Sequence, residues 1–459
     1  MKPLEAVSHF MQNVFSPADA SDLPAAGLYH FVRTIDGFEH KLHLRIEKDG
    51  SGVFFVDANS IIYLNQSAGC IAYWHFSGKT KIEIIHYLSS IFGNSIDFTE
   101  DYQTTIDRLE GVLHPDDTCP ICDLDLDLAL PFSNDPLAPY RMDLAVTYRC
   151  NNDCAHCYNA RSRNFAELST EEWKRILDQV WEIGIPHVVF TGGEPTLRKD
   201  LPELIAYAQK KGLVTGLNTN GRRLNNPEYV RTLVQSGLDH VQITFESHLP
   251  EIHDEMVRHN GAWQETVQGI TNAVNSSLYV MTNTTILGSN AKFLPDTLRY
   301  LGTLGVPTVG LNALIYSGAG LTVNNGISEE ELPALLDIAR AITDQQQQRL
   351  IWYTPTQYCH FNPVQFELGI KGCSAARYNM CIEPNGDVIP CQSYYQSLGN
   401  ILHNDWASIW EHPLALQLRY HDDLPQACSA CEFLAECGGG CPLARQAGKV
   451  NNPVSVHTI

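Results

Sequence analysis

The sequence predicts an α/β protein built around a partial (β/α)6 barrel of the TIM type. Between about residues 141 and 349, six apolar stretches alternate with six amphipathic helical stretches, which indicates a parallel sheet closed or partly closed like a barrel. A small, winged-helix-like α+β domain is predicted before the barrel. An irregular, cysteine-rich domain is predicted after it, since seven of the fourteen cysteines follow residue 370. A chain of 459 residues is long enough for two or three domains.

The N-terminal part is predicted to be a lead-in over 1–27 and a small domain over 28–113. Alternation of apolar and polar residues predicts three strands, at 42–46, 53–56 and 61–64. Helical periodicity predicts three helices, at 68–76, 82–92 and 102–113. Residues 114–140 contain five prolines and an acidic run, which is typical of a linker.

The barrel is predicted to occupy residues 141–349. Its predicted strands are 143–149, 187–191, 213–219, 240–246, 279–286 and 308–315. The predicted helices between and after them are 170–183, 200–211, 227–236, 264–276, 292–304 and 328–346. Residues 350–459 are expected to be irregular, with bound metal clusters replacing part of the missing apolar core.

The charge balance disfavours two classes of partner. With 52 acidic against 31 basic residues the net charge is −21, whereas nucleic acids and anionic membranes attract basic patches. The N-terminus shows no signal-peptide pattern, and no apolar run reaches the roughly 18 residues of a membrane span. We therefore expect a cytoplasmic protein, whose closely spaced thiols are metal ligands. The alternative, a secreted disulfide framework, does not suit so large and core-rich a chain.

Three cysteines follow the first predicted barrel strand, in the order Cys150-x3-Cys154-x2-Cys157. This places them at the carboxyl end of that strand, where barrel enzymes carry their chemistry. If three thiolates hold a four-iron cluster, one iron stays open for a substrate or cofactor. A zinc site is the alternative interpretation of the same spacing.

Two motifs resemble the radical S-adenosylmethionine (SAM) superfamily. The first is the stretch from Cys150 to Tyr158, and the second is Thr191-Gly192-Gly193-Glu194-Pro195 at the end of the next strand. The resemblance implies that the open iron binds SAM and that one electron cleaves its sulfonium. The products are methionine and a 5′-deoxyadenosyl radical, which takes hydrogen from an unactivated carbon. The resemblance also implies that Gly192, Gly193, Glu194 and Pro195 bind the methionyl amine.

Further SAM contacts are carried over from the same resemblance. Asn220 ends the third strand in a polar turn. Thr244 and Glu246 are expected ribose and carboxylate contacts, although Thr244-Phe245-Glu246-Ser247 departs from the family's usual Ser-Leu-Asp-Gly. Arg258 matches an arginine that commonly meets the SAM carboxylate, and a solvated helix charge is the alternative. Asn283 and Asn312 would either face the barrel mouth or be ordinary polar residues at strand ends.

The C-terminal cysteines resemble a SPASM domain, which carries two auxiliary iron–sulfur clusters. The resemblance implies that Cys373, Cys381, Cys391 and Cys441 hold the first auxiliary cluster. Cys428, Cys431 and Cys437 would hold the second. The family's final cysteine is missing, because residues 442–459 contain none. The second cluster would then have an open iron, be incomplete or absent, or take another ligand from His457, Cys359, Asp422 and Asp423.

Residues 53–113 resemble the PqqD-like peptide-recognition domain, on the stretches Asn65–Ala68 and Tyr73–Gly78. In that family a leader peptide adds as a strand to the edge of the sheet. A winged-helix module or a structural cap is the alternative.

The combined resemblance implies a maturase that forms a thioether or carbon–carbon crosslink in a ribosomally made peptide. Its partners would be a precursor peptide, bound by its leader, and an electron donor such as flavodoxin or ferredoxin. A SPASM enzyme acting on a small molecule in cofactor or tetrapyrrole synthesis is the second interpretation, and a degenerate binding protein is the third. Cys119 and Cys122 are either ligands or redox thiols, or simple loop residues. His156 and His187 are expected to be structural, and no catalytic acid or base is assigned.

Overall fold

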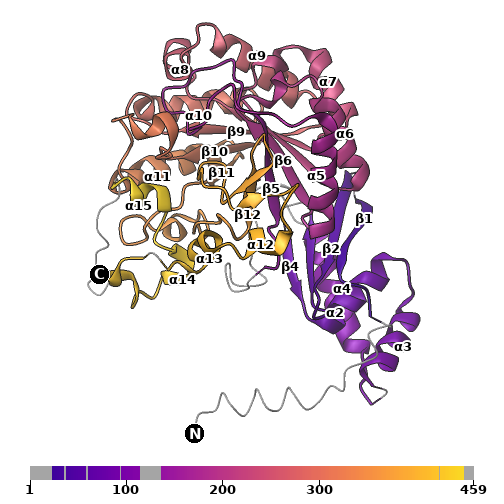
Figure 1. Ribbon diagram of the computed structural model, residues 1–459. Coiled ribbons are helices and arrows are strands. Elements are labelled where there is room, and N and C mark those ends of the chain that lie inside the picture. The colour runs from indigo at the N-terminus through magenta and orange to yellow at the C-terminus, as the bar shows by residue number, and fades with distance from the viewer. Residues whose placement is uncertain are drawn as a thin grey trace. The chain divides into compact units, whose positions relative to one another are not determined.

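The computed structural model describes residues 23–35, 38–57, 60–93, 95–113, 136–422 and 424–448. The chain divides into two compact units, Met1–Ala129 and Leu130–Ile459, and each is described by itself (Figure 1). The predictions for Cys119, Cys122, Asp423, His457 and most of the lead-in fall outside the described residues. Among the helices that are described, none is both long enough and apolar enough to cross a membrane.

The N-terminal unit is an antiparallel sheet followed by three helices. The strands pair in the order of the chain and are β1 (Gly27–Ile35), β2 (Phe38–Ile46), β3 (Gly52–Val56) and β4 (Ser60–Leu64). The helices are α2 (Gln66–Phe76), α3 (Lys81–Phe92) and α4 (Thr99–Leu113). The prediction of three strands was therefore wrong by one. Strand β1 was missed because its side chains are half-buried or exposed along its whole length, so that no clean alternation marks it.

The core of this unit lies between the sheet and helix α2. Leu42 and Leu44 of β2 are fully buried, as is Ile71 of α2. The Phe76 ring at the end of α2 stacks on Phe54 of β3, with ring centroids 5.0 Å apart. It also contacts Phe31 of β1, at 5.7 Å between centroids. An aromatic cluster therefore joins the outer strand β1 to the helix layer.

The second unit contains a ten-stranded sheet, counted over the described residues. Strands β5 to β11 lie side by side in chain order and run parallel. On the other side of β5, strand β12 pairs parallel to it, and β13 and β14 continue the sheet antiparallel. The bounds are β5 (Arg141–Thr147), β6 (His187–Gly192), β7 (Val214–Thr219), β8 (His240–Thr244), β9 (Tyr279–Thr285), β10 (Thr308–Asn312), β11 (Arg349–Trp352), β12 (Asn379–Ile382), β13 (Asp387–Ile389) and β14 (Gly399–Asn400).

The six βα repeats predicted from the sequence are all present. Their helices are α5 (Thr170–Ile183), α6 (Leu201–Lys211), α7 (Pro227–Gln235), α9 (Ala262–Val274), α10 (Leu294–Thr303) and α11 (Leu332–Gln345). A further helix, α8 (Pro250–Val257), and the seventh parallel strand, β11, were not predicted. The C-terminal segment is also more regular than predicted, since besides its short strands it contains α12 (Trp406–Trp410), α13 (Pro413–Tyr420), α14 (Leu434–Cys437) and α15 (Pro442–Gln446).

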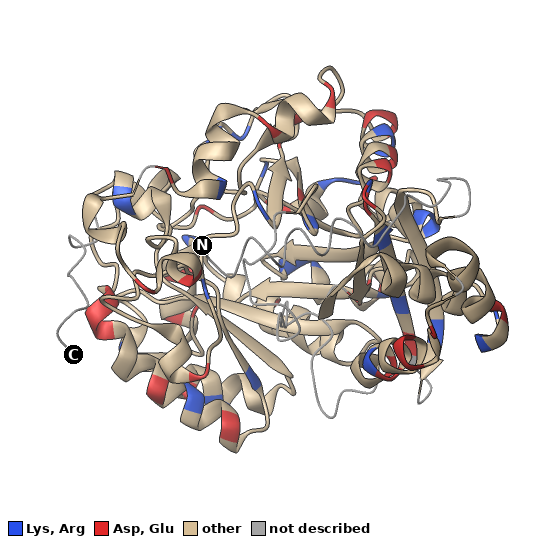
Figure 2. Cartoon of the chain, turned by 90° about the horizontal axis from the view of Figure 1, so that it is seen from below, with Lys and Arg blue, Asp and Glu red and all other residues tan. Residues whose placement is uncertain are grey.

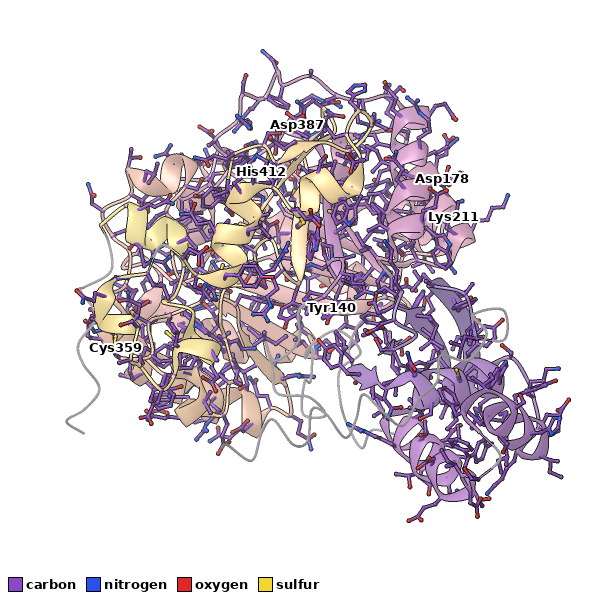
Figure 3. All side chains as sticks on the ribbon, turned by 60° about the horizontal axis from the view of Figure 1, so that its bottom comes forward. Tyr140, Asp178, Lys211, Cys359, Asp387 and His412 are labelled. Atoms are coloured by element: carbon purple, nitrogen blue, oxygen red, sulfur yellow. The ribbon has the colours of Figure 1, made fainter. Side chains whose placement is uncertain are left out.

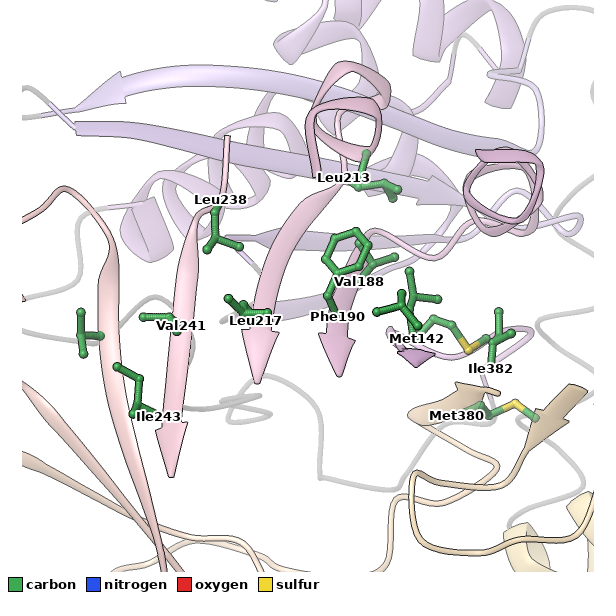
Figure 4. Packing of buried hydrophobic residues seen from close by; sticks show 14 of the residues in the cluster. Met142, Val188, Phe190, Leu213, Leu217, Leu238, Val241, Ile243, Met380 and Ile382 are labelled. Atoms are coloured by element: carbon green, nitrogen blue, oxygen red, sulfur yellow. The ribbon is translucent and has the colours of Figure 1, made fainter. Parts of the chain in front are cut away.

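One apolar core serves both the barrel strands and the C-terminal segment. Met142 of β5 and Phe190 of β6 are fully buried in it, and so are Met380 and Ile382 of β12 (Figure 4). Helix α5 adds Trp173, which is fully buried. Because β12 supplies core side chains, the C-terminal segment is integral to the barrel's packing.

Charged residues are distributed over this fold. Figure 2 shows Lys and Arg interspersed with Asp and Glu along the outer helices.

Candidate active site

The predicted SAM-site residues lie at the carboxyl ends of neighbouring parallel strands. The cysteine triad follows β5, the glycine pair ends β6, Asn220 follows β7 and Glu246 follows β8. Since parallel strands end at one rim of the sheet, the topology brings these four segments together.

The glycine pair allows a close approach between two backbones. A Cβ atom on Gly192, whose φ is +134°, would lie 2.0 Å from the Thr147 carbonyl oxygen. A Cβ on Gly193 would lie 2.5 Å from the carbonyl oxygen of Arg149, the residue before Cys150. The Gly193 and Glu194 amides donate to the Thr147 and Arg149 carbonyls, each at 2.8 Å. Glycine is therefore required here so that the edge of β6 can support the start of the triad loop.

The Glu194 carboxylate is fully buried and accepts hydrogen bonds from its own chain. One oxygen accepts from Thr196 and from the Thr219 hydroxyl at 2.7 Å, and the other accepts from the Asn220 amide at 2.8 Å. Burial raises the pKa of Glu194, and these hydrogen bonds oppose the rise. The carboxylate thus fixes the end of β7 against the end of β6. This geometry favours a positioning role for Glu194 beside its predicted role toward the SAM ammonium.

The three triad thiols lie within electrostatic range of one another. Burial raises the pKa of Cys154 well above its ordinary value, and the charges of Cys157 and Cys150 raise it further. Burial likewise raises the pKa of Cys150 to about 11. Thiolates gathered in this way need a compensating cation, which iron would supply. The donor set therefore fits a metal cluster.

Within the described residues, no three His, Cys, Asp or Glu side chains converge closely enough to hold a single metal ion. In a four-iron cluster each thiolate binds a different iron, so its ligands are spaced more widely than those of one ion.

Two arginines that the sequence analysis missed hold the triad loop. The buried Arg222 side chain donates to the Asn151 carbonyl at 2.6 Å and to the Asn152 side chain at 2.8 Å. Arg163 donates to the Cys150 carbonyl at 3.0 Å and to the Asn152 carbonyl at 2.6 Å. Neither arginine stands in a recognisable motif. The only available signal for Arg222 was its place directly after the Asn220-Gly221 turn.

Glu246, predicted as a SAM contact, is buried and bound to the protein itself. Its carboxylate lies 2.9 Å from His156 Nε2 inside the triad loop, and it accepts from the Thr285 amide at 3.0 Å. His156 was expected to be structural, and this contact ties the triad loop to the ends of β8 and β9. Thr244 is half-buried at the end of β8.

Arg258 lies next to the triad loop in the backbone but points its side chain to solvent. The Asp153 and Ala155 amides donate to the carbonyls of Val257 and Met256, at 3.0 and 2.9 Å. Arg258 itself is exposed and has a positive φ of 52°. The backbone at Arg258 is therefore close to the triad loop in space, and the Arg258 side chain is exposed beside it.

Polar atoms from two further strands are left without partners. Asn283 Oδ1 on β9 and Asn312 Oδ1 on β10 are buried and accept no hydrogen bond from the described residues. Because buried polar atoms are normally satisfied, these groups mark positions where a bound polar ligand would be stabilised.

Burial of His253 is expected to make the stability of the folded chain depend on pH. Its Nδ1 accepts from the Glu246 amide at 3.2 Å, and burial lowers its pKa to about 4. Below the unfolded pKa of about 6.5 the unfolded chain takes up a proton that the folded chain refuses, so stability is lost as pH falls. The free energy of unfolding of the native chain should therefore fall relative to that of His253→Gln by about 2 kcal/mol between about pH 7 and pH 5. Urea titrations of both proteins measure this, and a constant difference would contradict it.

The predicted ligands of the first auxiliary cluster are also grouped. The thiols of Cys373, Cys381 and Cys391 have raised pKa values, first through burial. Cys441 raises the pKa of both Cys373 and Cys391, and Cys391 raises that of Cys381. The four thiols therefore lie close enough to interact, although they come from three parts of the C-terminal segment.

Hydrogen bonds link residues around the triad loop to residues beside the thiols of the first auxiliary cluster. Tyr158, next to Cys157, donates from its hydroxyl to the side chain of Gln392, next to Cys391, at 3.2 Å. Arg161 makes a two-pronged ion pair with Glu383, at 2.7 and 2.8 Å. Tyr148 also donates to Glu383, at 3.1 Å.

The Arg161–Glu383 pair should have a large effect on stability. The Glu383 side chain is fully buried, whereas Arg161 is 29% exposed. Arg161→Ala would leave the carboxylate with the Tyr148 hydroxyl alone, and we expect a loss of about 3 kcal/mol in the free energy of unfolding. Anaerobic urea unfolding followed by circular dichroism measures it. The matched control, Arg161→Ala with Glu383→Gln, should recover part of the loss because no charge remains buried.

Comparisons with known proteins agree with this geometry. A family model described as the radical SAM superfamily matches residues 144–301. A model of the SPASM iron–sulfur cluster-binding domain matches residues 373–432.

Two curated relatives each share 30% identity with this chain. One is a PqqA peptide cyclase from Granulibacter bethesdensis, aligned over 307 residues, or 64% of this chain and 80% of the relative. The other is an Fe-coproporphyrin III synthase from Methanosarcina barkeri, aligned over 342 residues, or 68% of this chain and 84% of the relative.

Among solved structures, Streptococcus suis SuiB bound to its precursor peptide SuiA has a similar fold. The TM-score is 0.68 at 18% identity, and the similarity covers 94% of this chain and 100% of SuiB. At this identity the likeness concerns the fold alone.

Proposed function

This chain belongs to the radical SAM superfamily and carries a SPASM iron–sulfur domain, and from that premise we propose that it matures a ribosomally made peptide. The modification would be a thioether or carbon–carbon crosslink. When bound, the triad cluster and SAM supply a carbon radical that abstracts hydrogen, while the protein orients the substrate and excludes water.

The N-terminal unit carries the peptide proposal. Within the described residues β1 pairs only with β2, so one of its edges is available for an added strand. Tyr29 and Phe31 of β1 pack on Tyr73 and Phe76 of α2, at 4.7 and 5.7 Å between ring centroids. We infer that residues 28–113 are a PqqD-like domain that binds a leader peptide along this edge. The peptide named in the SuiB structure and in the cyclase relative supports the same substrate class.

We assign the site residues as follows. Cys150, Cys154 and Cys157 would hold the SAM cluster, in a barrel domain over 141–349. The SAM edge would comprise Gly192, Gly193, Glu194, Pro195 and Asn220, with Thr244, Glu246 and Arg258 as outer contacts. A SPASM-type domain over 350–459 would hold the first auxiliary cluster on Cys373, Cys381, Cys391 and Cys441, and the second on Cys428, Cys431 and Cys437. A cytoplasmic flavodoxin or ferredoxin would supply the electron.

A small-molecule enzyme is the second candidate. The Fe-coproporphyrin III synthase is as similar in sequence as the peptide cyclase, and the alignment covers slightly more of it. The buried, unpartnered Asn283 and Asn312 oxygens would suit a polar group of either substrate class.

Trapping the substrate separates these candidates. The full chain with Cys150, Cys154 and Cys157 replaced by alanine is expressed anaerobically in its native host, and what co-purifies is identified by mass spectrometry. We expect a short peptide. Adding that peptide to native enzyme with SAM and a reductant should yield 5′-deoxyadenosine and a peptide lighter by a pair of hydrogen atoms.

Fe-coproporphyrin III, added in place of the peptide, is the matched comparison. Turnover of the porphyrin with no change in any peptide would overturn the maturase proposal. A second comparison uses Val32→Pro, because Val32 on β1 is 41% exposed and proline removes a backbone donor from the strand. Peptide capture should weaken in this variant, while 5′-deoxyadenosine formation without peptide stays unchanged.

A further inference from the structure

The second auxiliary group has three assigned thiols, all between Cys391 and Cys441. Cys428, Cys431 and Cys437 are followed by Cys441, which interacts with the first group, and residues 442–459 contain no cysteine. Four-iron clusters in proteins are commonly held by four cysteines. The three-dimensional neighbours of Cys437 therefore decide what could complete the set.

The loop after β11 lies directly on Cys437. The Tyr358 amide donates to Cys437 Sγ at 3.4 Å, and Cys437 Sγ lies 3.7 Å from the Thr356 carbonyl oxygen. A Cβ atom on Gly440 would lie 3.1 Å from the Gln357 amide nitrogen. Backbone atoms of Thr356 and Tyr358, on either side of residue 357, thus contact the Cys437 sulfur. Amide donors of this kind are typical around cluster sulfurs, where they tune the potential.

Cys359 is held in this loop by its neighbour Tyr358. The Tyr358 ring faces Phe433, which lies between Cys431 and Cys437, with centroids 6.4 Å apart. The Tyr358 hydroxyl accepts from the Lys371 amide at 2.9 Å. In Figure 3 Cys359 is labelled next to the yellow ribbon of the C-terminal segment. The anchored ring therefore fixes the backbone from which the Cys359 side chain projects.

Cys359 is also close in space to both ends of the Cys428–Cys437 segment, since its thiol lies within electrostatic range of Cys428 and of Cys437.

The other candidate fourth ligands among the described residues are less well placed than Cys359. Asp422 is exposed. His360 Nδ1 is 3.4 Å from Glu330, and its Nε2 is buried with no hydrogen-bond partner among the described residues. Imidazole is a poorer match than thiolate for an iron–sulfur cluster, but His360 stays a rival that an experiment must separate from Cys359.

We propose that Cys359 is the fourth protein ligand of the second auxiliary cluster, completing Cys428, Cys431 and Cys437. The proposal rests on the iron–sulfur assignment made under the proposed function. It places the fourth ligand in the loop after β11, before the matched SPASM region at 373–432. The second cluster would then have no open iron, so it would relay electrons and would not bind substrate.

The test uses the full chain with Cys150, Cys154 and Cys157 replaced by alanine, reconstituted anaerobically, so that only auxiliary clusters remain. This protein should hold about eight iron atoms. Adding Cys359→Ala should remove about four of them, or leave the iron with a changed electron paramagnetic resonance spectrum. The matched control is Cys70→Ala, since Cys70 is a buried thiol of the N-terminal unit. It should leave iron content and spectrum unchanged.

Further variants distinguish a lost ligand from a lost fold. Cys359→Ser keeps the size and offers oxygen, and should retain iron with a shifted reduction potential. Added 2-mercaptoethanol should alter the spectrum of Cys359→Ala by binding the opened iron, and should leave the parent spectrum unchanged.

The proposal is overturned if Cys359→Ala and Cys359→Ser both match the Cys70→Ala control. It is equally overturned if His360→Ala, and not Cys359→Ala, changes the spectrum. All of these readouts are independent of peptide turnover, so failure of the maturase proposal would leave the result intact.

Discussion

Replacing Cys154 with alanine is expected to lower reductive cleavage of SAM by at least about a thousandfold. Cys154 is the central thiol of the triad, and its charge interacts with those of Cys157, Cys150 and Glu246. Alanine would leave two thiols on the loop, too few to retain a four-iron cluster with one open iron. The measurement is 5′-deoxyadenosine formed under anaerobic conditions with SAM and dithionite.

Cys70→Ala provides the control, because it removes a thiol that lies in helix α2 of the other unit. It should form 5′-deoxyadenosine at the native rate. If Cys154→Ala cleaved SAM as fast as this control, the triad would not be the site of the open iron.

The second large effect is expected for Gly193→Ala. The added methyl group would lie 2.5 Å from the Arg149 carbonyl oxygen and 2.6 Å from that of Tyr148. Both are backbone atoms just before Cys150, so relief of the clash must displace the triad loop. A shift of about 1 Å at a reacting centre can cost about a hundredfold in rate, and overpacking costs about 1–3 kcal/mol in stability. SAM cleavage and urea unfolding, measured on the same preparation, test both losses.

Gly111→Ala is the matched control for this substitution. Gly111 lies in helix α4, and a Cβ there would meet nothing within 4 Å. This variant should keep full activity and gain about 1 kcal/mol in stability, since alanine is the better helix former. Native-like cleavage by Gly193→Ala would show that the backbone tolerates the methyl group and that the close approach is dispensable.

Local sequence patterns predicted most of the barrel. Helices such as α5 (Thr170–Ile183) have a strong apolar face and a Ser169–Glu172 capping box, both of which can be read from a single stretch of chain. Strands β11 (Arg349–Trp352) and β12 (Asn379–Ile382) were missed because each has only four residues. Such strands exist because distant partners pair with them, and no local pattern reports that pairing.

The candidate site likewise contains residues that local patterns predict and residues that they do not. The triad and the glycine pair could be predicted as site residues because their spacing is local. Arg222 and the Arg161–Glu383 pair were missed because their partners lie far away in the chain, 222 residues apart for the ion pair. Glu194 was predicted as a site residue, but its four hydrogen bonds to Thr196, Thr219 and Asn220 could not be foreseen. The sequence offered Cys359 as one of several candidate ligands of the second auxiliary cluster, and only the fold shows that it lies near Cys437.

The pairing of β12 with β5 has a consequence during synthesis on the ribosome. Strand β5 is made first among the barrel strands, and β6 covers one of its edges soon afterwards. Its other edge stays unpaired until β12 has been made. Strand β12 pairs Cys381 with Asp143 and is made after all the other parallel strands. Until then a nascent chain carries an open strand edge next to the triad, and such edges invite pairing with other chains. Slow or interrupted translation before β12 should therefore favour aggregation of the nascent chain.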